Sequence, residues 1–213
     1  MHLVRKEFHL EEETALEFAA SRGFGLLVTW DGSKPCGSHL PFIIRRDAHR
    51  AIVSTHVTAN NPLAALAEDN RSFLLAVTGP DAYVSNDFYA TSDQVSTWLY
   101  EAVHLTGPAR LLTMDSNRQH GDDLLAVAEK RLAPKTAWNL ELMEAEKRDS
   151  MLARIKVIEF EVQLVESQRK LNQFKPDVDH VAVVDALSLH GDEHGRTIAD
   201  KMRALRPHLL YRS

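Results

Sequence analysis

Apolar positions recur with two different periods in the first part of this chain, which predicts one helix followed by three strands. Residues 11–22 place Ala15, Leu16, Phe18 and Ala19 on one helical face, with glutamates in the first turn. Gly23 is well placed to end this helix. After it come apolar and β-branched runs at 24–30, 37–44 and 51–57. Connections this short join only antiparallel neighbours, so the pattern predicts a meander.

The next segment predicts a short helix and two longer strands. Asn61 followed by Pro62 is typical of a helix start, with the asparagine as cap and the proline in the first helical position. A helix should then run over 63–69. Strand-like runs follow at 71–85 and at 95–113, the second interrupted or bent near Gly107-Pro108.

The pattern becomes helical between residues 115 and 149. Pro134 divides this segment into two elements, and the second should contain Trp138, Leu142 and Met143. From Ile158 to Leu164 apolar residues alternate with glutamate and glutamine, which predicts a half-buried final strand. Beyond Pro176 the chain is expected to be helical again, with a turn at Gly191 and a last helix over 197–206.

These elements predict a mainly β fold with peripheral helices, in the α+β class. About six strands with helices outside them make a small, mostly antiparallel barrel. We expect a barrel domain over residues 1–175, with inserted helices at about 115–149, and a C-terminal helical extension over 176–213. Gly23-Phe24-Gly25 does not open a helix, which excludes a dinucleotide-binding loop of the Rossmann type.

Composition and charge indicate a globular protein in the cytoplasm. The chain is 44% hydrophobic and 26% charged, and the sequence has neither a signal-peptide core nor an apolar run of about 18 residues that would cross a membrane. A single cysteine, Cys36, excludes an intrachain disulfide. The net charge of -5 opposes general attraction to nucleic acid. A local exception is the tail, where five basic residues accompany one acid: Arg196, Lys201, Arg203, Arg206 and Arg212, with Asp200.

One candidate ligand site involves the second and third predicted strands and the helix start that follows them. If the strands pair, Ser38, His39, Leu40 and Pro41 lie beside Thr55 and His56, with Asn60 and Asn61 at one end. Free N–H groups and two amide side chains suit an anionic group, and the strand backbones suit a flat heterocycle. The alternative is structural: Asn61 is simply a helix cap, and both histidines are ordinary strand residues.

An aromatic stretch from Gly79 to His104 is a second candidate. It holds three of the four tyrosines and one of the three tryptophans of the chain. Rings with a polar tip often line pockets or subunit contacts. The same residues would also suit a well-packed hairpin of the barrel.

Several of these motifs, in their order and spacing, resemble the PaiB-like proteins, which are described as FMN-binding negative transcriptional regulators. The motifs are His39-Leu40-Pro41-Phe42, Asn61-Pro62, Gly79-Pro80, Ala82-Tyr83-Val84-Ser85, Tyr89, Thr97-Trp98 with Tyr100, Val103-His104, and Lys170-Leu171 with Gln173. The resemblance implies an antiparallel split β-barrel, similar to the pyridoxamine-phosphate-oxidase-like flavoproteins. It also implies a homodimer with FMN at the subunit interface. On this reading Tyr83, Trp98 and Lys170 join the strand residues around the cofactor.

The chain departs from the family pattern at four positions. Family members usually have a basic residue before the Asn-Pro step and an aromatic residue after it, where this chain has Thr58 and Ala64. The family's Lys-x-Ser-Gln-Asn ending has Asn172 in place of serine and ends in Phe174. An arginine fork gives a phosphate charge-assisted hydrogen bonds that threonine lacks.

Three functions therefore remain open from the sequence. The first is an FMN-binding regulator or flavin-dependent oxidoreductase, in which the flavin would exchange hydride and no residue is identified as catalytic. The second is a cofactor-free regulator with a decayed flavin site, which binds DNA through the basic C-terminal helix. Its DNA binding should weaken when Arg203 and Arg206 become alanine. The third is heme binding or degradation, with His39, His56 or His104 as axial ligand.

Overall fold

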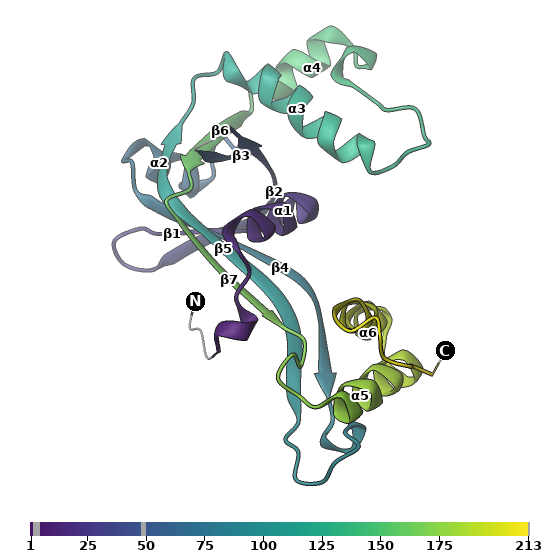
Figure 1. Cartoon of the computed structure of the whole chain (residues 1–213). Helices are drawn as coiled ribbons and strands as arrows, with labels where there is room; N and C mark the ends of the chain where they lie inside the picture. The colour runs from purple at the N-terminus through teal and green to yellow at the C-terminus, as the bar shows by residue number, and fades with distance from the viewer. Residues whose placement is uncertain (2–4, 48–49, 213) are drawn as a thin grey trace. The chain divides into compact units, whose positions relative to one another are not determined.

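A computed structural model describes residues 1, 5–47 and 50–212 of the chain (Figure 1). Its strands are β1 (Phe24–Trp30), β2 (Pro35–Arg46), β3 (Ala51–Thr58), β4 (Ser72–Val84), β5 (Thr97–Leu111), β6 (Ile155–Glu161) and β7 (Leu164–Lys170). Its α-helices are α1 (Glu12–Arg22), α2 (Pro62–Glu68), α3 (Ser116–Lys130), α4 (Ala145–Leu152), α5 (Asp177–His190) and α6 (Glu193–Leu205). Short 3-10 turns occur at Lys6–Phe8, Asn86–Phe88 and Leu140–Leu142.

The strands form one seven-stranded sheet in the order β4-β1-β2-β3-β6-β5-β7, with β4 also pairing with β5. The registered pairs from β1 to β6 are antiparallel, as the short connections predicted. The pairing of β4 with β5 joins the first strand of this order to a late one. The α+β class predicted from the sequence is therefore confirmed.

Contacts divide the chain into two compact units, and β4 and β5 contribute residues to both. Unit 1 comprises residues 1–15, 78–103 and 166–213, and unit 2 comprises residues 16–77 and 104–165. The predicted boundary after residue 175 lies inside unit 1. Each unit is described separately below.

The core of unit 2 is built from one face of its strands. Its largest fully buried side chains include Leu27, Phe42, Phe73, Leu105, Ile158 and Phe160. The opposite face of β6 is also covered, since Glu159 is only 3% exposed and forms ion pairs with Arg45 and Arg110. The prediction that this strand is half-buried is therefore wrong. Residues 158–164 also divide between β6 and β7 and do not form a single strand.

Strand β5 continues through Gly107-Pro108, where the sequence predicted an interruption or a bend. A Cβ atom on Gly107 would lie 2.0 Å from the carbonyl oxygen of Glu161. Glycine is thus required by the close approach of β5 to the end of β6.

The inserted helices of unit 2 differ from the prediction in one place. Trp138, Leu142 and Met143 lie outside any α-helix, in a segment whose only helical part is the 3-10 turn at residues 140–142. The side chain of Asn139 accepts a hydrogen bond from the N–H of Glu141 and so caps this short turn. The second α-helix, α4, begins later, at Ala145.

Unit 1 has a core of its own, which the C-terminal helices complete. Helices α5 and α6 lie side by side (Figure 1) and bury apolar residues together with the unit 1 ends of β4 and β5. This core contains Ala82, Val84, Tyr89, Leu99, Leu171, Val183, Val184, Leu187, Ile198, Ala199 and Met202. The buried carboxylate of Glu101 adds an ionic link, because Arg169 and Lys201 each approach it to 2.6 Å. None of the described helices is long and apolar enough to cross a membrane.

Candidate functional site

The outward face of β4, β1 and β2 in unit 2 is apolar over three strands. Residues paired directly across antiparallel strands point to the same side of the sheet. The register pairs Phe24, Leu26, Val28 and Trp30 of β1 with residues of β2, and it pairs Leu26 and Val28 with Ala76 and Leu74 of β4 as well. We call the resulting set the outer apolar face: Phe24, Leu26, Val28, Trp30, Pro35, Gly37, His39, Pro41, Leu74 and Ala76.

This face is unusual for a sheet whose other side already forms the core. Antiparallel sheets with one solvated side normally alternate apolar residues with polar ones. Here Phe24 and Trp30 are 53% and 55% exposed, and no residue of the face carries a formal charge when His39 is neutral. The ring of His39 stacks on Phe24, with centroids 6.3 Å apart and planes 19° apart. Such a face is suited to a flat ring or to a second protein surface.

A polar cluster adjoins β2 on its other side. Asn61 caps α2 as predicted, because its Oδ1 accepts from the N–H of Leu63 at 3.0 Å. Its Nδ2 donates to Ser38 Oγ at 3.0 Å, which leaves the Ser38 hydroxyl proton available to another acceptor. Asn60 is exposed in the preceding turn. The structure thus brings Ser38 and Asn61 together, and the helix-cap interpretation of Asn61 is correct.

Two other predicted site residues have side chains that stabilise the fold. Leu40 and Thr55 are buried in the core of unit 2, and Thr55 Oγ1 donates to the carbonyl oxygen of Pro41 at 2.6 Å. Strand alternation places Ser38, Leu40 and Thr55 on the inner side and His39 and Pro41 on the outer side. These five side chains therefore cannot all face one ligand, although their backbones remain adjacent.

His56 has a partner that the sequence did not indicate. Its Nδ1 lies 2.9 Å from Nε2 of His120 on α3, and Nδ1 of His120 lies 3.0 Å from Ser54 Oγ. Burial lowers the pKa of His56. Burial, with the neighbouring His56 and Arg45, lowers the pKa of His120 to about 4. Sequence analysis missed His120 because a single histidine in a polar helix carries no signal of burial.

The histidines considered for heme do not gather into a ligand cluster. One ring nitrogen of His56 is engaged by His120, and His39 lies on Phe24. Within residues 1, 5–47 and 50–212, no group of three or more His, Cys, Asp or Glu residues is arranged to hold a metal ion. Heme binding stays a prediction.

Unit 1 carries the remaining predicted cofactor residues. Tyr83 and Trp98 are both about half exposed and meet edge to face, with ring centroids 6.0 Å apart. Lys170 Nζ donates to Thr97 Oγ1, and burial lowers the pKa of this lysine. Residues of the aromatic stretch therefore have two different roles. Tyr89 and Leu99 are in the core, whereas Tyr83 and Trp98 form a half-exposed pair, which we call the open aromatic pair.

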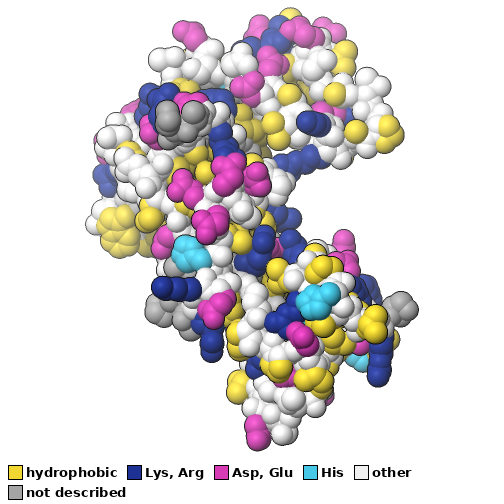
Figure 2. All heavy atoms as spheres, in the orientation of Figure 1, with side chains coloured by type: hydrophobic (Ala, Val, Ile, Leu, Met, Phe, Trp, Pro, Cys, Tyr) yellow, Lys and Arg dark blue, Asp and Glu magenta, His cyan; other side chains and the backbone are white. Residues whose placement is uncertain are grey.

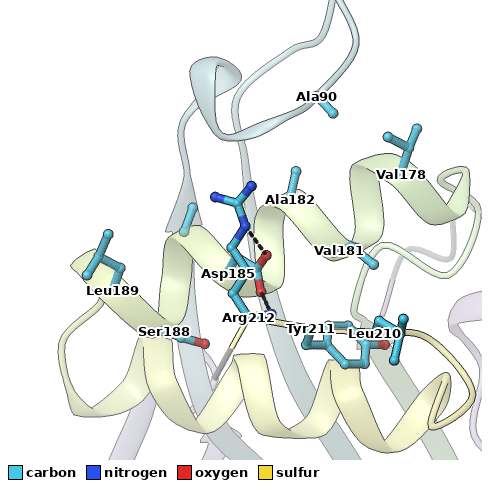
Figure 3. A pocket seen from close by; sticks show the side chains of 11 residues that line it. Ala90, Val178, Val181, Ala182, Asp185, Ser188, Leu189, Leu210, Tyr211 and Arg212 are labelled. Atoms are coloured by element: carbon cyan, nitrogen blue, oxygen red, sulfur yellow. Dashed lines mark hydrogen bonds and ion pairs between the residues drawn. The ribbon is translucent and has the colours of Figure 1, made fainter.

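A groove of about 740 Å³ follows α5 in unit 1 (Figure 3). Its lining is mostly apolar, with the Asp185–Arg212 ion pair crossing it. The predicted cofactor residues, all within the described part of the chain, do not line this groove.

The basic residues of the C-terminal tail are largely paired within unit 1. Lys201 binds Glu101, and Arg203 donates to Asp200 and to Ser188 Oγ. Arg206 binds Asp177 and two backbone carbonyl oxygens. On the face shown in Figure 2, Lys and Arg side chains lie among Asp and Glu side chains. Most of the basic residues that suggested a nucleic-acid surface therefore bind other groups of unit 1 and hold α6 in place.

Comparison with known families shows which family the chain belongs to. The family model described as "Putative FMN-binding domain" matches residues 1–164. The chain belongs to this family. The PaiB-like resemblance is therefore confirmed, and FMN, the cofactor predicted from the sequence, is the one that the family description names.

Relatives and solved structures agree with this assignment. The "Protease synthase and sporulation protein PAI 2" of Bacillus subtilis (strain 168) is 26% identical over 193 residues, which cover 89% of this chain and 90% of that protein. The FAD and heme binding protein from Mycobacterium smegmatis has a TM-score of 0.55 at 15% identity, over 75% of this chain and 71% of that chain. A conserved hypothetical protein from Mycobacterium tuberculosis has a TM-score of 0.56 at 12% identity, over 82% and 94%. These structural matches confirm the antiparallel split-barrel fold.

The residues of unit 2 suit the chemistry of FMN. A flat apolar surface is available for the ring on the outer apolar face, and β2 carries that surface on one side and the Ser38–Asn61 pair on the other. Ser38, Asn60 and Asn61 carry hydroxyl and amide groups, which are donors of the kind that ribityl and phosphate oxygens accept from. Hydrogen bonds from neutral donors are weaker than those from arginine, so we expect phosphate to contribute less here than at a site containing arginine.

Proposed function

We propose that this protein is a homodimeric FMN-binding regulator whose flavin and subunit interface lie on the outer apolar face. The observation that supports this most strongly is that β4, β1 and β2 leave a continuous apolar surface uncovered on unit 2. Burial of apolar area contributes about 25 cal/mol per Å². Covering such a surface with a second copy and a flavin ring would therefore be favourable.

Within this proposal the site residues have separate tasks. The outer apolar face, including Phe24 and His39, packs against the ring and excludes water. Residues 35–41 of β2 are registered with β1, and β3 pairs only with residues 42–46 of that strand. In this proposal the ribityl-phosphate chain passes around β2 beside residues 35–41 and meets Ser38, Asn60 and Asn61 on the other side. Tyr83 and Trp98, the open aromatic pair of unit 1, form a separate surface on which a ring could stack, and Lys170 donates to Thr97, the residue before Trp98.

When bound, FMN supplies reversible electron and hydride exchange. The polar groups of the predicted site are hydrogen-bond donors and acceptors, and we assign none of them as a general acid or base. The relative named as a protease synthase and sporulation protein is consistent with regulation.

Direct binding measurements test the cofactor. The purified protein should show flavin absorbance or should bind added FMN with micromolar affinity. Val28→Glu places a charge in the middle of the outer apolar face, between Gly37 and Leu74. We expect this variant to fold but to lose both FMN and dimerisation. The matched control Val127→Glu changes a 42% exposed valine on α3 and should keep both. A folded wild-type protein that binds no FMN refutes the proposal.

A DNA-binding regulator is the second candidate, and the exposed arginines of the tail favour it. Arg196 is exposed and Arg212 is 93% exposed, whereas Arg203 and Arg206 are tied to the fold. The better test is therefore Arg196→Ala with Arg212→Ala, which should weaken salt-sensitive DNA binding without unfolding the protein. A flat mobility-shift titration of the wild type contradicts this candidate.

A further inference from the structure

Helix α3 is held on the sheet mainly by polar groups. The buried residues of this 15-residue helix are Asn117 and His120, while Val127 is 42% exposed. Asn117 Nδ2 donates to the carbonyl oxygens of Leu152 and Ile155, at 2.8 and 3.1 Å. The apolar residues Leu124 and Leu125 of this helix are only partly buried, so the docking of α3 depends strongly on its hydrogen bonds.

His120 makes the hydrogen bonds that join α3 to β3. They form one chain from Ser54 Oγ through both nitrogens of His120 to Nδ1 of His56. A neutral imidazole has one donor and one acceptor nitrogen, so two neutral rings satisfy every bond of the chain, with all protons donated toward His56 or all donated toward Ser54. One added proton can be shared between the rings, but a second leaves two donors facing each other at 2.9 Å.

Charged groups from several elements surround the pair. Arg45 of β2 binds Glu159 of β6 and lies 3.9 Å from Asp123 of α3. Arg110 of β5 binds the other oxygen of Glu159 at 3.3 Å. The Glu159 carboxylate is therefore shared between two arginines. A proton added to His120 is therefore repelled by the charge of Arg45, and the shared carboxylate of Glu159 offsets little of this repulsion.

We propose that the Ser54–His120–His56 chain is a pH-sensitive latch that releases α3 from β3 when the histidine pair is protonated. Burial and nearby positive charge already keep the pKa of His120 at about 4, far below its ordinary value, and that of His56 is lowered as well. The docked state thus disfavours the added proton. By linkage, acid favours the undocked state, in which the imidazoles reach water.

The release can be local because hydrogen bonds between β5 and β6 hold together the point where the segment containing α3 leaves the sheet. The N–H of Leu112, just after β5, donates to Val157 O of β6 at 2.9 Å, and the registered pairs of β5 with β6 lie directly before it. Segments with few buried apolar contacts open at lower free energy than the core. Undocking α3 would expose Ser54, His56 and Glu159 while the sheet keeps its register.

Hydrogen exchange combined with NMR tests the latch in the intact chain. Amides of residues 116–130, corrected for intrinsic rates, should exchange at least about tenfold faster at pH 4.5 than at pH 7.5, while amides of 73–77 in β4 stay protected. The midpoint of this change should coincide with the titration of the His120 ring in the same sample. Protection of α3 that persists after His120 has titrated overturns the proposal.

Variants separate the latch from general acid unfolding. His120→Gln removes the ring with the more strongly lowered pKa and leaves only His56 to titrate. In this variant α3 should therefore lose most of its pH dependence, whether it is docked or undocked at pH 7.5. His194→Gln, a change at an exposed histidine, should behave as wild type. If His120→Gln retains the wild-type dependence on pH, the latch lies elsewhere and the proposal is wrong.

Discussion

Individual residues in this protein are constrained by close approaches that composition does not reveal. At Gly107, the carbonyl oxygen of Glu161 occupies the space of a side chain. At Gly195 of α6, the nearest atoms to an added Cβ lie 3.5 Å away or more, which is ordinary contact. The two glycines therefore have opposite tolerance for alanine.

Gly107→Ala should accordingly destabilise the protein by about 2 kcal/mol or more, because backbone must move to admit the methyl group. Gly195→Ala should be neutral or should stabilise α6 by up to about 1 kcal/mol, because alanine favours helix. Urea unfolding of both variants measures the difference. Equal stability of the two variants would contradict the close approach of β5 to β6.

The buried ring of His180 should make the stability of unit 1 depend on pH. It is fully buried, its Nε2 donates to Met202 O at 3.0 Å, and its Nδ1 is a buried acceptor with no partner among the described residues. Burial lowers the pKa of this ring below the ordinary value of 6.5. Below pH 6.5 the unfolded chain then binds more protons than the folded one, so stability falls as the pH falls from 6.5 toward the folded-state pKa.

The measurement is the free energy of unfolding of unit 1 between pH 7.5 and 5, followed by exchange of amides in α5 and α6. Wild type should lose stability over this interval, and His180→Asn should lose less. A pH-independent stability would show that His180 is not held neutral.

At the scale of elements, α6 is held by an ion pair of Lys201, one of the basic tail residues that the sequence suggested for binding DNA. Lys201 pairs with the buried carboxylate of Glu101, which Arg169 also binds. Removing one partner of a buried ion pair costs more than removing an exposed charge, because it leaves the other partner desolvated.

Lys201→Met should therefore reduce the stability of unit 1 by about 1 to 3 kcal/mol. Arg196→Met, an exposed position on the same helix, should change it by less than about 0.5 kcal/mol. Thermal unfolding of the two variants makes the comparison. If they are equally stable, α6 is not anchored through Glu101.

The order of elements could be predicted from local patterns, but their tertiary partners could not. Asn61-Pro62 specified the start of α2 through local capping chemistry. The alternation at residues 158–164 suggested one solvated face, yet Glu159 is buried by Arg45 and Arg110, which come from other strands. The same limit applies to the site, because side-chain partners such as His120 for His56 arise from a helix more than sixty residues away.

At the scale of the whole molecule, the family assignment and the outer apolar face support one account. The family model covers residues 1–164, so it includes the strands that form this face. The resemblance was carried by motifs along the chain, whereas the apolar face required the strand register. The departures at Thr58 and Ala64 do not remove the surface on which a flavin ring would lie.

Equilibrium titration of the purified protein with FMN, followed by flavin fluorescence and by sedimentation, tests this account most directly. We predict saturation at about one FMN per chain with micromolar or tighter affinity, in a dimer that Val28→Glu abolishes and Val127→Glu preserves. A folded protein that leaves flavin fluorescence unchanged at all FMN concentrations would contradict it.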